Sequence, residues 1–118
     1  EGVLPRIAGS GFDSVPGGAA YANRSAFSFH YYCWLAQGIS EQKPSSAPYA
    51  PLQKAECDRA FGPLVFDSVE DSIAHIGGAS IMTEFGAMTP NTSNPTSVGT
   101  EEVEWVLGEA DRRFQSWT

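Results

Sequence analysis

The chain has 118 residues and a formal net charge of −7, from 7 Lys and Arg against 14 Asp and Glu. This acidic balance disfavours nucleic acid and anionic membrane surfaces as partners, because both attract positive charge, and no apolar run reaches the roughly 18–20 residues of a transmembrane helix. Hydrophobic residues make up 42% of the chain, too many for a disordered segment, and the length fits one domain at most.

The first half of the sequence predicts one strand between irregular segments. Residues 1–25 are interrupted by Gly and Pro too often for regular structure. Residues 26–33 are dense in aromatic side chains and free of Gly and Pro, which is typical of a strand. Residues 38–51 contain three prolines and form a long excursion, after which residues 53–61 are expected to form a short helix.

The middle of the sequence predicts a helix followed by a strand. In residues 68–78, Ser68 is a plausible N-cap and Gly77 can take the left-handed conformation that ends a helix. Residues 79–85 have a β-branched centre and stop at Gly86, which indicates a short strand.

The last third predicts another helix and strand. Residues 87–99 form a polar loop, Thr100 is expected to cap a helix over residues 101–113, and residues 114–118 begin a third strand. Strands that alternate with helices favour an α/β fold with parallel strands.

Side chains that could take part in chemistry lie at the end of each predicted strand. Glu84 ends the second strand, and catalytic side chains gather at the carboxyl ends of strands in α/β barrels and open sheets. His30 and Tyr32 end the first strand on one face, and a phenol beside a carboxylate holds it ionised, which suits a nucleophile. Trp117 could stack on a sugar ring. The alternatives are an exposed strand-end acid, a core histidine with packing tyrosines, and a core tryptophan.

Taken in order, these strand ends resemble one enzyme family. Residues 28–33 (Ser-Phe-His-Tyr-Tyr-Cys), 82–86 (Met-Thr-Glu-Phe-Gly) and 115–117 (Gln-Ser-Trp) resemble the sixth, seventh and eighth strands of glycoside hydrolase family 5. Residues 11–25 resemble the segment before strand six in its endoglycoceramidase-like branch. The resemblance implies a partial (β/α)₈ TIM barrel, in which residues 1–118 are the C-terminal part of a single catalytic domain that lacks strands one to five.

The same resemblance assigns roles to five residues. Glu84 matches the nucleophile of a retaining β-glycosidase, Tyr32 the tyrosine that hydrogen-bonds this nucleophile, and His30 a histidine that orients the site. Trp117 matches the aromatic residue beneath the sugar, and Asn23 a polar sugar contact. The implied substrate is a β-linked glycan or glycolipid, cleaved between glycan and ceramide, and neither a metal nor an organic cofactor is implied.

The second carboxyl of such an enzyme is missing from the sequence. Retention needs a general acid/base about 5–5.5 Å from the nucleophile, which in this family comes from an Asn-Glu-Pro-type motif, and no Asn-Glu occurs in the chain. Glu101, Glu102 and Glu104 are expected on the outer first turn of a helix and are not nominated. The chain opens without Met, which indicates a processed or excised piece. Because strands one to five of the implied barrel are missing, we expect this piece to be poorly folded and inactive when expressed alone.

Other functions remain open. A family 5 β-glucanase or a sterol or ceramide glucosidase would share the nucleophile strand, and a non-catalytic carbohydrate-binding module could keep the same aromatic and carboxylate pattern. Tyr49 and Leu52, in and beside the excursion after the first strand, could cover a lipid aglycone; the alternative is a surface loop.

Cysteines and glycosylation sequons bear on location. Cys33 and Cys57 could form a disulfide that pins the excursion, or they could remain reduced thiols. Residues 23–25 and 91–93 fit the Asn-X-Ser/Thr sequon, although for Asn23 we favour the sugar-contact role. A disulfide together with sequons predicts a secreted or lysosomal protein.

Overall fold

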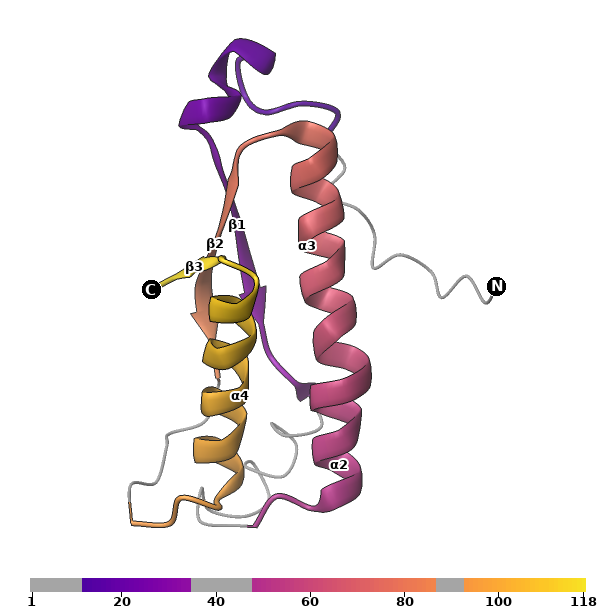
Figure 1. Cartoon of the computed structure of the whole chain (residues 1–118), viewed down its shortest axis with the longest axis vertical. Coiled ribbons are helices and arrows are strands. Elements are labelled where there is room, and N and C mark those ends of the chain that lie inside the picture. Colours follow the sequence, from indigo (N-terminus) through magenta and orange to yellow (C-terminus); the bar gives the residue numbers. More distant parts are fainter. Residues whose placement is uncertain (1–11, 35–47, 87–92) are drawn as a thin grey trace, which may run out of the picture.

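The computed structural model describes residues 12–34, 48–86 and 93–118. The elements, in chain order, are η1 (Ala19–Arg24), β1 (Ala26–Tyr31), α2 (Pro51–Ala55), η2 (Glu56–Phe61), α3 (Gly62–Ile76), β2 (Ala79–Phe85), α4 (Val98–Arg112) and β3 (Ser116–Trp117). The strands are parallel and lie in the order β1-β2-β3, with helices in both connections (Figure 1). Within these described ranges, no helix is both long enough and apolar enough to cross a bilayer.

Both long helices pack on the same face of the sheet. Phe29 and Tyr31 of β1 contact Phe66 of α3, each with ring centroids 5.7 Å apart. Tyr31 also lies 5.8 Å from the ring of Trp105 on α4. Met82 of β2 is fully buried in the same cluster. This aromatic layer is the core that holds the strands in place.

The opposite face of the sheet is open. Ala26, Ser28 and His30 of β1 are exposed there, and the hydroxyls of Ser28 and Thr83 lie 2.7 Å apart in a hydrogen bond across the two strands. Parallel sheets are usually covered on both faces. In the part of the chain that the structure describes, this sheet is covered on one.

The helix before β2 is longer than the sequence predicts. α2, η2 and α3 form one continuous rod from Pro51 to Ile76 (Figure 1), so Ser68 lies inside a helix and is not an N-cap. Its hydroxyl donates to the carbonyl of Leu64 at 2.8 Å. Gly62 and Pro63 lie inside the rod without breaking it, because the wider π turn of η2 precedes them and a proline is tolerated in the first turn that follows.

The start of α4 also differs from the prediction. The N-cap is Ser97, whose hydroxyl accepts from the backbone N–H of Thr100 at 3.4 Å, so Thr100 is the third residue of the helix rather than its cap. At its other end, Arg113 follows the helix and binds across to α3. Its guanidinium lies 2.6 Å from Asp67 and 2.6 Å from Glu109.

Candidate active site

Glu84 and Tyr32 meet at the carboxyl end of the sheet. Glu84 lies near the end of β2 with its side chain 57% exposed, and Tyr32 follows the last residue of β1. The Tyr32 hydroxyl donates a 2.6 Å hydrogen bond to Oε2 of Glu84. This bond raises the pKa of Tyr32, so the phenol stays protonated and continues to donate.

His30 completes the cluster. Its Nδ1 lies 3.6 Å from the same Oε2 of Glu84, and its ring lies 6.4 Å from that of Tyr32 in an edge-to-face arrangement. Among the described residues, both contacts to Glu84 go to Oε2, which leaves Oε1 without a partner. A half-exposed carboxylate with one oxygen held and the other free can act as a nucleophile or as a hydrogen-bond acceptor for a sugar.

An irregularity in the strand pairing creates this contact. The register runs from Ala26 opposite Ala79 to Phe29 opposite Met82, and then skips one residue, so that His30 lies opposite Glu84. Thr83 and Glu84 consequently both point to the open face, the first toward Ser28 and the second toward His30 and Tyr32. Such bulges commonly re-aim a side chain beside a functional site.

The structure does not bring Trp117 to this cluster. Trp117 lies opposite Met82, in mid-strand, and therefore shares the helix-covered face. Its indole N–H donates to Asp111 of α4 at 3.0 Å, and its ring packs edge-on against Phe85. A sugar held at Glu84 would therefore not lie on the Trp117 ring as it is placed here.

Asn23 lies at the other end of the sheet. It belongs to η1, immediately before β1, whereas Glu84 lies where β1 and β2 end (Figure 1). A strand of six residues spans about 20 Å. Asn23 is therefore too far from Glu84 to touch the same sugar ring.

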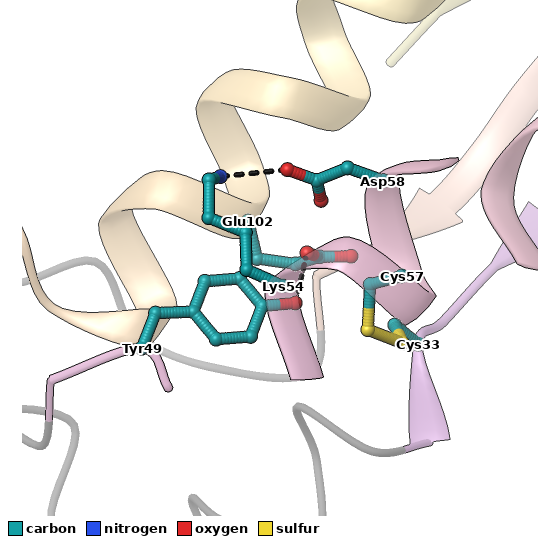
Figure 2. The surroundings of a disulfide bond; sticks show 6 residues. All are labelled: Cys33, Tyr49, Lys54, Cys57, Asp58 and Glu102. Atoms are coloured by element: carbon teal, nitrogen blue, oxygen red, sulfur yellow. Dashed lines mark hydrogen bonds and ion pairs between the residues drawn. A yellow bond between two sulfur atoms is a disulfide. The ribbon is translucent and has the colours of Figure 1, made fainter. Parts of the chain in front are cut away.

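The pairing of Cys33 with Cys57 is the disulfide alternative considered from the sequence. The bond joins the end of β1 to η2 with a Cα–Cα distance of 5.8 Å, and both cysteines are buried (Figure 2). The carboxylate of Glu102 lies beside the two sulfurs. Because these sulfurs are bonded to each other, they are not thiolate ligands for a metal.

A buried carboxylate beside the disulfide is absent from the sequence prediction. Glu102 is 1% exposed, so its placement on an outer first turn is wrong. It accepts a 2.7 Å hydrogen bond from Tyr49 (Figure 2). Burial raises the pKa of Glu102, and the bond from Tyr49 only partly offsets this. Tyr49 is itself buried, which removes it from the lipid-covering role suggested above, whereas Leu52 is exposed.

Lys54 links the rod to α4 beside this acid. Its Nζ lies 2.7 Å from Asp58 (Figure 2) and 3.2 Å from Glu101. Burial alone would lower the pKa of Lys54, but the two ion pairs outweigh it and the pKa is raised. Burial also raises the pKa of Asp58 despite its bond to Lys54.

The burial of Glu102 could have been predicted from the correct first residue of α4. α4 begins at Val98, and after its first two residues the buried positions are Glu102, Val106, Glu109 and Ala110, a spacing of four, three and one that marks one helix face. The assignment of Thr100 as the cap hid this pattern, because it placed Glu102 in the first turn, where acids usually face solvent.

No family model matches the chain, and no curated protein or solved structure matches it either.

Proposed function

We propose that this chain carries the nucleophile of a retaining β-glycoside hydrolase, with Glu84 as that nucleophile. The observation that carries the proposal is the 2.6 Å hydrogen bond from Tyr32 to Glu84 at the carboxyl ends of adjacent parallel strands. The catalytic groups of α/β enzymes gather at this edge of a parallel sheet. The resemblance of these strand ends to glycoside hydrolase family 5 supports the same assignment.

Each residue of the cluster has a defined part in the reaction. The Glu84 carboxylate attacks the anomeric carbon of a β-glycoside, the bond from that carbon to the leaving oxygen breaks, and water later releases the sugar with retention. Tyr32 donates to Oε2 and thereby holds the carboxylate in place. His30 lies beside the same oxygen and limits the rotation of the carboxylate.

The general acid/base belongs to another part of the proposed barrel. Within the described ranges, Glu84 contacts a tyrosine and a histidine but no carboxyl group, and the sequence has no Asn-Glu motif. The open polar face of the sheet supports a barrel, because the strands of a barrel turn one face inward toward other strands. In this proposal β1, β2 and β3 are strands six to eight, and strands one to five supply the missing acid.

The proposed substrate is a glycosphingolipid, cleaved between the glycan and ceramide. A β-glucan or a sterol glucoside is the alternative, since the nucleophile serves all three. Comparing turnover of a glycolipid with that of a cello-oligosaccharide by the intact protein separates them.

A 2-fluoro-glycoside with an activated leaving group tests the nucleophile directly. Such a leaving group departs without protonation, so labelling needs Glu84 but not the missing acid. Peptide mapping should find the sugar on Glu84, and Glu84→Gln should abolish labelling, whereas Glu104→Gln, an exposed acid on α4, should not. Sugar binding without labelling would instead make the chain a carbohydrate-binding module, and labelling elsewhere would refute the assignment.

A further inference from the structure

Asn23 stands in an Asn-Arg-Ser sequon at the end of the sheet opposite Glu84. A sugar-contact role would need it near the Glu84 carboxylate, and the length of β1 separates the two. The structure thus argues against a sugar-contact role for Asn23 and leaves N-glycosylation, the other role considered.

The Asn23 side chain is accessible and uncommitted. The residue is exposed, and its side chain makes no hydrogen bond within the described part of the chain. Beside it lies an open hollow of about 290 Å³, lined by Ala22, Asn23, Ser25, Gly78 and Ala79. A first sugar linked to Asn23 has room there without displacing the core.

The sequon lies at the end of a short helix that buries none of its side chains. η1 is a short 3₁₀ helix of six residues with no buried side chain, and such turns are weakly held. Ser25, the hydroxyl residue of the sequon, makes a single side-chain bond, to the carbonyl of Tyr21 at 2.9 Å. Both polar groups of the sequon can therefore be presented to a transferase.

The buried disulfide points to the compartment in which this modification occurs. Cys33 and Cys57 are 2% and 0% exposed and bonded to each other. Disulfides form and persist in oxidising compartments, and N-linked glycans are added to secreted proteins at surface sequons.

We propose that Asn23 is an N-glycosylation site. The amide nitrogen of Asn23 forms a bond to the anomeric carbon of a lipid-diphosphate-linked oligosaccharide. The bond from that carbon to the phosphate oxygen breaks, the lipid diphosphate leaves with the electron pair, and the amide gives up a proton. The glycan covers the amino end of the sheet and leaves the Glu84 end free.

Expression of the full chain through a eukaryotic secretory pathway tests the site. Peptide mapping before and after enzymatic deglycosylation should find a glycan on the peptide that contains Asn23, with Asn converted to Asp on release. Asn23→Gln and Ser25→Ala should each remove it. Ser25→Thr should retain it, which guards against loss through misfolding, and Asn94→Gln should have no effect because Pro95 blocks that sequon.

The opposite result is equally clear. An unmodified Asn23 peptide in a cell that glycosylates a reporter sequon on the same secreted chain would overturn the proposal. Modification of residues 91–93 alone would overturn it too.

Discussion

Tyr32 holds Oε2 of Glu84 at 2.6 Å although Tyr32 lies one residue beyond the paired part of β1. Its two neighbours along the chain hold it in place instead of strand hydrogen bonds. Tyr31 is buried among aromatic rings on one side, and Cys33 is tied to η2 by the disulfide on the other. The position of Tyr32 is therefore fixed by the residues on either side of it.

Replacing Tyr32 with Phe should slow formation of the glycosyl-enzyme. A hydrogen bond to a charged group contributes about 1.5–3 kcal/mol, which corresponds to a rate loss of roughly 10- to 150-fold. The rate of labelling by an activated 2-fluoro-glycoside measures this. Tyr21→Phe, an exposed tyrosine at the other end of the sheet, should label at the wild-type rate, and equal rates for both variants would contradict the role of Tyr32.

Removal of the disulfide should loosen the Tyr32–Glu84 bond before it unfolds the chain. Closing a loop of 24 residues contributes about 3.5 kcal/mol to stability in the chain-entropy account. In a Cys33→Ser/Cys57→Ser variant that remains folded, the pKa of Tyr32 should fall back toward its ordinary value, because the bond that raises it is weakened.

Ring-carbon NMR titration of Tyr32 reads this shift directly. A merely structural disulfide would lower the midpoint of denaturation and leave the pKa of Tyr32 raised, so the two roles are separable.

Burial of Glu102 should make the protein less stable as pH rises. Its pKa is raised by burial, so between its unfolded and folded pKa values the native state binds the extra proton. Stability then falls as pH increases through that window. Glu102→Gln keeps the acceptor for Tyr49 without the charge, and should melt higher than the wild type at pH 7 and at the same temperature near pH 4.

Thermal unfolding at both pH values checks this, with Glu104→Gln as the matched exposed control. A gap that stays constant between pH 4 and pH 7 would show that the charge of Glu102 is not the cause.

Loss of Arg113 should separate the ends of α3 and α4. Its side chain is 18% exposed, and Glu109, one of its partners, is 9% exposed, so removal leaves a largely buried carboxylate with weaker pairing. We expect Arg113→Ala to cost about 2 kcal/mol, between the values for exposed and buried pairs. Chemical denaturation should show a much smaller cost for Arg24→Ala, an exposed arginine on η1.

β1 and β2 could be predicted from the sequence because they depend on local pattern, whereas the contact between Glu84 and Tyr32 also depends on the register irregularity between Phe29 and His30. Aromatic and β-branched runs marked β1 and β2, and the carboxyl ends of parallel strands necessarily share an edge. The helix boundaries could not be predicted in the same way. A glycine and a proline commonly lie at helix ends, yet positions 62–63 lie inside the rod, directly after the π turn of η2.

The positions of Trp117 and Asn23 could be predicted only with knowledge of the fold. Trp117 depends on its register against Met82, which no local pattern encodes. Asn23 precedes a parallel strand and so belongs at the amino end of the sheet, a deduction available from topology but not from resemblance. The close packing at Gly62, where an added Cβ would overlap the ring of Trp105, is likewise a tertiary fact.

Thr83, the residue skipped in the pairing of β1 with β2, determines whether Glu84 is exposed or buried. In an unbroken alternation Thr83 would stay on the open face and Glu84 would turn with Met82 toward the helices. There it would be desolvated among aromatic rings, as Glu102 is elsewhere in this chain. The one-residue shift in register between Phe29 and His30 therefore leaves Glu84 in contact with solvent, whereas Glu102 is buried.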